Sequence, residues 1–313
     1  MKYTLGFDIG GTKCAVILGT ETIPENIDQL IIAKKAFPTN VQRGYQAVLE
    51  ELFDTADSLL AEMEIKNTDL RGIGISCGGP LDSKRGVIMC PPNLPDWDNV
   101  PIVKMAEEHF GVKTHLQNDA NACAYAEWKY GAAKGTSNAV FLTFGTGMGA
   151  GLILNGRLYS GTHDMAGEVG HIRLTDDGPE GYGKNGSFEG YCSGGGIAKS
   201  AHFLAENSNI QPTYSIEGIT AKILAEKMYA GDEFATLVYR NCAEKLAAGL
   251  SLIIDIVDPE CIVIGSIYAR NREFFDGIIL PIIEKEALCG KNCKILPAKL
   301  GEHIGDFAAL SLA

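Results

Sequence analysis

Residues 5–12 read LGFDIGGT, an apolar run that ends in an acid and a glycine pair. A second apolar run follows from Cys14 to Leu18. Because a tight glycine turn joins neighbouring antiparallel strands, this segment predicts a β-hairpin. The pattern returns at residues 142–147, which read LTFGTG and precede the apolar run from Gly149 to Leu154. Two such hairpins, one in each half, predict a duplicated α/β fold of two domains with a cleft between them.

The composition agrees with a globular chain of two domains. The chain has 313 residues, of which 46% are hydrophobic and 21% charged, and a single domain usually takes ~100–200 residues. Lys and Arg number 27 and Asp and Glu number 39, so the formal net charge is −12. Such a field repels phosphate backbones and anionic lipid surfaces, so we expect neither nucleic acid nor a membrane as a partner.

The first residues and the cysteines indicate a cytoplasmic protein. Residues 1–8 read MKYTLGFD and lack the long apolar region of a signal peptide. No stretch reaches the ~18 uncharged apolar residues that a membrane helix needs. The nine cysteines are odd in number and lie mostly in apolar runs, which is typical of reduced, buried thiols.

Hydrophobic periodicity predicts alternating strands and helices along the rest of the chain. We expect strands over residues 31–37, 70–76 and 261–264, helices over 41–63, 101–110, 119–130, 215–229, 233–257, 270–287 and 305–312, and a loop-rich segment over 161–200.

The two glycine clusters are candidate phosphate sites. Glycine lets backbone N–H groups approach a phosphate without interference from a Cβ, and the Thr12 hydroxyl adds a donor. Asp8 precedes the first turn and could hold Mg²⁺ through water. A plain glycine hairpin is the alternative for each cluster. The chain has no GxxxxGK[ST] loop, and residues 145–151 open a strand instead of a helix, which argues against a dinucleotide site.

Asp119 follows a predicted strand and begins a predicted helix. It is either a first-turn acid of that helix or a general base at the end of a strand, where open α/β sheets bind ligands. A carboxylate there can take the proton of a hydroxyl that attacks a γ-phosphoryl group.

Taken in order, these motifs resemble those of the ROK (repressor, open reading frame, kinase) family of sugar kinases, within the actin–hexokinase–heat-shock ATPase superfamily. The resemblance runs nearly end to end. Residues 8–13 resemble the family's first phosphate motif, 91–97 its sugar-side loop, 118–122 its catalytic motif, 145–149 its second phosphate motif, 167–171 its GExGH signature and 258–265 its adenosine-side strand.

The resemblance implies an actin/hexokinase-like (ribonuclease H-like) fold. It implies a small domain of residues 1–118, completed by a C-terminal helix at about residues 301–313, and a larger domain of residues 119–300. The implied activity is ATP-dependent phosphorylation of a hexose at the 6-hydroxyl by a glucokinase-like enzyme. ATP and Mg²⁺ are the implied cofactors, and a homodimer is the implied assembly.

The resemblance also implies roles for individual residues. Asp119 is the implied catalytic base, and Asp8 the implied water-mediated Mg²⁺ ligand. The implied sugar-binding residues are Gly79, Asn93, Asn118, Glu168, His171 and Glu189. The implied ATP- and phosphate-binding residues are Asp8, Gly10, Gly11, Thr12, Lys13, Gly145, Thr146, Gly147, Gly265 and Ser266, the last standing where the family commonly has a second glycine.

One segment departs from the family pattern. After the GExGH signature the family usually carries CxCGxxGCxE, whose cysteines bind a structural zinc together with the histidine. Residues 180–189 read EGYGKNGSFE, which puts Glu180, Tyr182 and Ser187 at the three cysteine positions and retains Glu189. Too few soft ligands remain for a closed four-ligand site, so we expect no structural zinc.

Other functions fit the sequence less well. A sugar-responsive repressor of this family would need an N-terminal helix-turn-helix, and the first strand leaves no room for it because it begins at Tyr3. An ATPase switch without sugar chemistry would not need Glu168 or His171, and a non-catalytic sugar sensor would not need Asp119. The sugar itself stays open among glucose, mannose, fructose, N-acetylmannosamine, N-acetylglucosamine, allose and β-glucosides, because a few side chains decide it.

Overall fold

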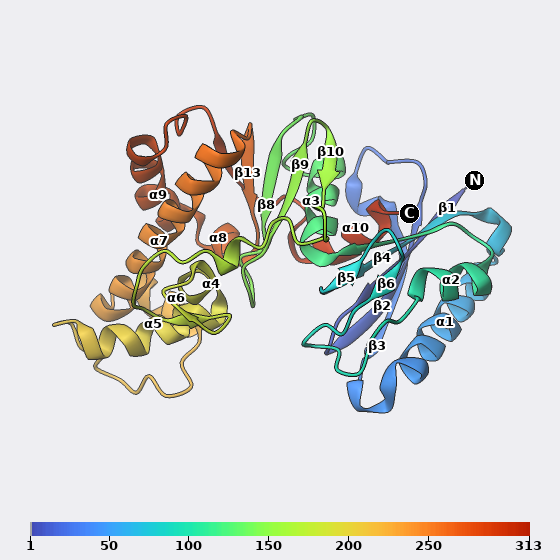
Figure 1. Ribbon diagram of the computed structural model, residues 1–313, viewed down its shortest axis with the longest axis horizontal. Helices are drawn as coiled ribbons and strands as arrows, with labels where there is room; N and C mark the ends of the chain where they lie inside the picture. The colour runs from blue at the N-terminus through green and yellow to red at the C-terminus, as the bar shows by residue number, and fades with distance from the viewer. Residues whose placement is uncertain (1) are drawn as a thin grey trace. The chain divides into compact units, whose positions relative to one another are not determined.

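The computed structural model describes residues 2–313 and divides into two compact units (Figure 1). The first unit runs to Lys134 and also includes residues 158–166 and 302–313, and the second includes residues 135–157 and 167–301. Each unit has its own hydrophobic core. Within residues 2–313, no helix combines the length and the apolar character needed to cross a membrane.

The first unit is built on a five-stranded sheet in the order β3-β2-β1-β4-β7. Its strands are β1 (Tyr3–Ile9), β2 (Lys13–Thr20), β3 (Ile31–Pro38), β4 (Leu70–Cys77) and β7 (Thr114–Asn118). Strands β1, β2 and β3 are antiparallel neighbours, while β4 pairs in parallel with both β1 and β7. The short turn between β1 and β2 permits the antiparallel pair, whereas each parallel pair needs a longer crossover.

The second unit repeats this strand order. Its sheet runs β10-β9-β8-β13-β14, with strands β8 (Ala139–Leu142), β9 (Ala150–Leu154), β10 (Arg157–Tyr159), β13 (Cys261–Ile264) and β14 (Lys294–Pro297). Again the first two strands are antiparallel, and the first, fourth and fifth are parallel. The duplication that the two glycine hairpins predict is therefore confirmed.

Helices cover both faces of the first sheet. Helix α1 (Gly44–Glu62) and helix α2 (Ile102–Phe110) lie side by side on one face (Figure 1), where the rings of Phe53 and Phe110 are 5.4 Å apart. Helix α10 (Ile304–Ser311) packs on the opposite face. It lies so close to β4 that a Cβ at Gly74 would lie 2.0 Å from the Ala309 carbonyl oxygen. Only glycine permits so close an approach of the helix.

Helix α3 (Asp119–Tyr130) belongs to the first unit. It packs against α10, and the Lys129 ammonium donates a hydrogen bond of 3.0 Å to the Ser311 carbonyl oxygen. The first segment of this unit therefore ends at Lys134. The sequence leads us to expect its end at Asn118.

The remaining elements are short strands and the helices of the second unit. These are β5 (Leu81–Asp82), β6 (Val87–Ile88), β11 (Glu180–Gly181), β12 (Lys184–Asn185), α4 (Phe188–Tyr191), α5 (Gly194–Asn207), α6 (Ala221–Tyr229), α7 (Glu233–Val257), α8 (Ser266–Arg270) and α9 (Arg272–Glu286).

Helix α5 lies partly in the segment that the sequence predicts to be loop. Glycine disfavours helix interiors, so the run Gly194-Gly195-Gly196 hides the start of this helix. Two tertiary features compensate for the low propensity. The Ser193 hydroxyl caps the helix by accepting the Gly196 N–H at 2.9 Å, and a Cβ at Gly196 would lie 2.4 Å from the Glu189 carbonyl oxygen, so the close packing requires glycine.

Candidate active site

The first group of predicted site residues lies at the carboxyl end of three parallel strands. The register pairs Asp8 of β1 with Ser76 of β4, and Ser76 with Gln117 of β7. Asn118 ends β7 and Asp119 begins α3. Asp8 and Asp119 therefore reach the same edge of the sheet, the edge where open α/β sheets bind ligands.

Asp119 is not needed as the cap of α3. Asn118 is the N-cap residue, and its side-chain oxygen accepts the Ala120 N–H at 2.9 Å. Asp119 accepts the same N–H at 2.7 Å through one oxygen. The side chain of Asp119 is exposed, but partial desolvation by the surrounding protein raises its pKa, and the hydrogen bond from Ala120 acts in the opposite direction. A raised pKa makes this carboxylate a stronger base.

Asp8 lies in a cluster of charges. Burial, followed by the nearby carboxylates of Asp306 and Asp119, raises the pKa of Asp8 to about 6, while Lys34 and Lys13 act in the opposite direction. Like charges raise a carboxyl pKa because they disfavour its ionised form. A bound cation would relieve this repulsion, so the group suits a site beside a divalent metal.

Two hydrogen bonds fix the shape of the first glycine turn. The Gly10 N–H donates to the Lys13 carbonyl at 3.1 Å, and the Thr39 hydroxyl donates to the Gly10 carbonyl at 2.6 Å. A Cβ at Gly11 would lie 2.3 Å from the Asn93 carbonyl oxygen. The backbone of the turn therefore contacts the predicted sugar-side loop directly.

The predicted sugar residues of the first unit are brought close together. A Cβ at Gly78 would lie 3.5 Å from the amide nitrogen of Asn93, and a Cβ at Gly79 would lie 3.1 Å from the amide nitrogen of Asn118. Asn93, Gly79 and Asn118, which come from three separate segments, thus line one polar region. Asparagine amides can both donate to and accept from sugar hydroxyls.

The second glycine turn lies at the end of β8 and is tied to two helix starts. The Gly149 N–H donates to the Thr143 hydroxyl at 2.9 Å and closes the turn around Thr146. The Gly194 N–H, at the start of α5, donates to the Gly145 carbonyl at 2.8 Å. Ser266 begins α8, and its hydroxyl oxygen would lie 3.8 Å from a Cβ at Gly145. The turn, Gly194 and Ser266 therefore form one group. Gly194 is not among the site residues predicted from the sequence, because its glycine run indicates a loop.

Glu189 joins the second glycine turn to the segment after the GExGH signature. Its Oε2 atom accepts the Met148 N–H at 2.9 Å, and the same atom would lie 2.8 Å from a Cβ at Gly147. The structure thus places one carboxylate oxygen on the predicted phosphate turn. The sugar contact assigned to Glu189 stays a prediction.

His171 and Glu168 lie on the short 3₁₀ segment of residues 169–171 and just before it. The His171 Nε2 atom is 4.0 Å from the Glu168 Oε2 atom, and each side chain is 42% exposed. The His171 ring stacks on the Tyr182 ring at 3.9 Å between centroids and 23° between planes. Tyr182 was not predicted as a site residue, although it is one of the three that replace cysteines.

Comparison with known proteins settles the family. The model of the ROK family matches residues 4–313. The chain belongs to the ROK family. A glucokinase of Thermotoga maritima is 30% identical over 287 residues, which cover 90% of this chain and 86% of that protein.

Two solved ROK structures share the fold. The ROK hexokinase from Thermus thermophilus has a TM-score of 0.80 and 29% identity, and the match covers 99% of this chain and 97% of that chain. A ROK family glucokinase from Streptomyces griseus, in complex with glucose and AMPPNP, has a TM-score of 0.75 and 28% identity, and the match covers 99% of each chain. Together with the repeated strand order, these likenesses confirm the predicted actin/hexokinase-like fold.

In this ROK chain a small hairpin occupies the segment where the family usually has its cysteines. Strands β11 and β12 pair through Gly181 and Lys184. The Ser187 hydroxyl donates to the Gly181 carbonyl at 3.0 Å, and the Leu174 N–H donates to the Gly186 carbonyl at 2.8 Å. Hydrogen bonds thus close the segment. Over residues 2–313, no three or more His, Cys, Asp or Glu side chains are grouped to hold a metal.

We expect the purified protein to contain no stoichiometric zinc. His171 and Cys192 are the remaining soft ligands near this segment, and a closed structural site needs four ligands. Elemental analysis of protein prepared without chelators measures the content directly. One zinc per chain that disappears in the His171→Ala variant would contradict the prediction, whereas chelator treatment should leave the unfolding midpoint unchanged.

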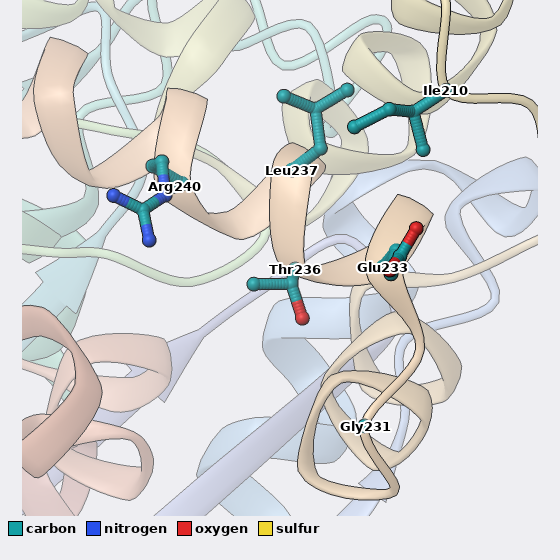
Figure 2. A pocket seen from close by; sticks show the side chains of 6 residues that line it. All are labelled: Ile210, Gly231, Glu233, Thr236, Leu237 and Arg240. Carbon is teal, nitrogen blue, oxygen red and sulfur yellow. The ribbon is translucent and has the colours of Figure 1, made fainter.

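A pocket of about 360 Å³ lies elsewhere on the second unit, at the start of α7 (Figure 2). It is lined by Ile210, Gly231, Glu233, Thr236, Leu237 and Arg240. None of the predicted site residues is among them.

Proposed function

We propose that the protein is an ATP-dependent hexose kinase of the glucokinase type, which transfers the γ-phosphoryl group of ATP to the 6-hydroxyl of its sugar. The observation that carries the proposal is the Asn118-Asp119 pair. In a ROK chain, it puts a carboxylate with a raised pKa at the ligand-binding edge of the sheet, while the neighbouring asparagine caps the helix.

In this mechanism Asp119 accepts the proton of the 6-hydroxyl as its oxygen attacks. The new bond forms between that oxygen and the γ-phosphorus, and the bond from the γ-phosphorus to the β,γ-bridging oxygen breaks, so that ADP leaves. The N–H groups of Gly10 and Gly145 already bond carbonyl oxygens within their own turns. The backbone N–H groups of Gly11 and Thr12, and of Thr146 and Gly147, hold the phosphates. Such preorganised donors stabilise charge as it develops.

The residues around Asp8 fit a magnesium ion that is held mainly by water and phosphate. Asp8 lies near the carboxylates of Asp306 and Asp119, but within residues 2–313 no three or more such side chains are grouped as metal ligands. In phosphoryl transfer Mg²⁺ is typically bound by one or two carboxylates together with water and phosphate oxygens. When bound, Mg²⁺ would neutralise charge on the phosphates. Asp8 and Lys13 would orient this end of the nucleotide, and Gly265 and Ser266 would lie beside its adenosine.

The residues assigned to the sugar are those that the family resemblance implies. We assign Gly79, Asn93, Asn118, Glu168, His171 and Glu189 to its hydroxyl groups. Glucose is the first candidate. Mannose, fructose, allose, N-acetylmannosamine, N-acetylglucosamine and a β-glucoside are the alternatives, because the same groups can bind any of them.

The test is a coupled assay of ADP release with the purified protein and a panel of these sugars. We expect release that depends on one sugar far more than on the others, and a product phosphorylated at O6 by phosphorus–proton NMR correlation. No sugar-dependent release with any member of the panel, together with normal folding, would reject the proposal.

Glu189 offers a prediction that separates its two contacts. We expect Glu189→Ala to raise KM for the sugar by at least ~10-fold, since a hydrogen bond to a charged acceptor contributes ~1.5–3 kcal/mol. Because the Met148 N–H loses its acceptor, KM for ATP should rise too. The control is Glu189→Gln, which keeps an oxygen for Met148 and should raise the sugar KM alone. If both variants change only the ATP KM, Glu189 does not bind sugar.

We also propose a homodimer, which rests on the family resemblance, and a cytoplasmic location, which rests on the apolar surroundings of the cysteines. Three apolar side chains of the second unit are exposed and could be covered by a second copy. Leu252 and Ile256 are 43% and 77% exposed and lie one turn apart on α7. Leu288 is 92% exposed, and its N–H bonds Asp255 of the same helix at 2.8 Å. Sedimentation should give a dimer, and Ile256→Asp a monomer if this face forms the interface.

A further inference from the structure

Tyr182 occupies an unusual backbone position. It and Gly183 form the two-residue loop between β11 and β12, with φ values of 53° and 67°. Two consecutive left-handed residues are typical of a type I′ turn, in which asparagine and glycine are preferred. A bulky aromatic residue is disfavoured there. Such an outlier indicates that its side chain has a role outside the turn.

The Tyr182 ring stacks on the imidazole of His171. The two rings lie nearly parallel at 3.9 Å. Gly170 permits this approach, because a Cβ there would lie 3.0 Å from the Tyr182 ring. A second bond ties the hairpin to the same residue, since the Lys184 ammonium donates to the His171 carbonyl oxygen at 3.1 Å.

The stack restrains the exposed side chain of His171. The His171 side chain is 42% exposed, and its Nε2 atom lies 4.0 Å from Glu168, beyond hydrogen-bond distance. Stacking covers a face of the imidazole and leaves its edge nitrogens uncovered by the Tyr182 ring. A ring fixed in this way can hydrogen-bond a sugar hydroxyl without first losing rotational freedom.

We propose that Tyr182 is a positioning residue, which holds the His171 imidazole in the orientation that binds the sugar. The inference rests on the proposed function for the sugar contact and on the observed stack for the positioning. Tyr182 itself need not touch the substrate. Its effect should therefore appear in sugar binding and not in the ATP site.

The decisive variant is Tyr182→Asn. Asparagine suits the left-handed turn position better than tyrosine does, so the hairpin should be retained and only the stack lost. Aromatic pairs contribute enough for about a 3- to 10-fold change in affinity. We expect KM for the sugar to rise about 3- to 10-fold, with KM for ATP and the unfolding midpoint unchanged. The matched control is Tyr182→Phe, which keeps the stack and should retain the wild-type sugar KM.

Proton NMR provides a readout that does not depend on activity. The chain has six histidines, so the imidazole C–H signals can be resolved, and loss of one signal in His171→Gln assigns the resonance. The Tyr182 ring current should shift this resonance upfield in the wild type and in Tyr182→Phe. In Tyr182→Asn it should move back toward the position of an unstacked histidine.

Each outcome has one meaning. An identical His171 resonance in the wild type and in Tyr182→Asn overturns the stack. A changed resonance with an unchanged sugar KM overturns the positioning role, and parallel losses in both KM values and in the unfolding midpoint assign Tyr182 a structural role only. Wild-type protein that releases no ADP with any sugar rejects the proposed function itself, whatever the resonance shows.

Discussion

We expect Asp119→Asn to lower kcat by ~10²–10⁴, the usual contribution of a positioned general base. Asparagine keeps the shape of the side chain, and its amide oxygen can still accept the Ala120 N–H that Asp119 accepts now. Asn118 remains as the cap of α3. The variant should therefore fold and bind both substrates with KM values close to those of the wild type, while the 6-hydroxyl keeps its proton.

Steady-state kinetics with both substrates varied, together with thermal unfolding, measures this. Asp54→Asn removes an exposed carboxylate from α1 and serves as the control. Since the pKa of Asp119 is raised, the acidic limb of the kcat/KM profile should lie above the ordinary aspartate range and should change in the variant. Near wild-type turnover would show that Asp119 is only a first-turn acid of the helix.

The sequence predicts those parts of the fold that local patterns determine. The two glycine turns sit between apolar runs, and turn chemistry depends on neighbouring residues. Helix α7 begins and ends where its periodicity indicates. Its start is also marked in the sequence by Asp232, whose side chain caps the helix by accepting the Ala235 N–H. Strand β14 and helix α5 were missed. A four-residue strand has little periodicity, and three leading glycines outweigh a helical pattern unless the packing of Gly196 is known.

The candidate site follows the same division. Asn118 and Asp119 are adjacent in sequence, so their motif could be recognised. The bond from Met148 to Glu189 joins residues 41 positions apart, and no local pattern indicates it. The stack of Tyr182 on His171 and the charge of Asp306 beside Asp8 likewise depend on how distant segments fold together.

Asp8→Asn should change activity and stability in opposite directions. If Asp8 orients water around Mg²⁺, its loss should lower activity about 10–100-fold, as expected for an outer-shell group of a metal site. The same substitution removes a negative charge that burial, Asp306 and Asp119 make unfavourable. Asp306 is itself 3% exposed and pairs with Lys34 at 2.5 Å. The free energy of unfolding should therefore rise.

The pH dependence gives the sign of this effect. Folding raises the pKa of Asp8 from 3.8 to about 6, so between these values the folded state holds a proton that the unfolded state has released. The contribution of Asp8 to stability thus falls as pH rises through this window, and the penalty is full above it. This pKa shift corresponds to a loss of at most about 3 kcal/mol in the free energy of unfolding when Asp8 is ionised. Because the protein relaxes around the charge, we expect a loss of about 1–3 kcal/mol.

Denaturant unfolding of the wild type and Asp8→Asn at several pH values between 4 and 8 tests this account. The two proteins should have nearly equal free energies of unfolding at the acid end of this range, and Asp8→Asn should gain about 1–3 kcal/mol by pH 8. Added MgATP should reduce the difference in the free energy of unfolding between Asp8→Asn and the wild type, because the bound cation favours the ionised Asp8 of the wild type. Asp54→Asn should show no such trend. If Asp8→Asn is less stable than the wild type at every pH, then Asp8 stabilises the folded state, and the account in which its ionised carboxylate destabilises the fold is wrong.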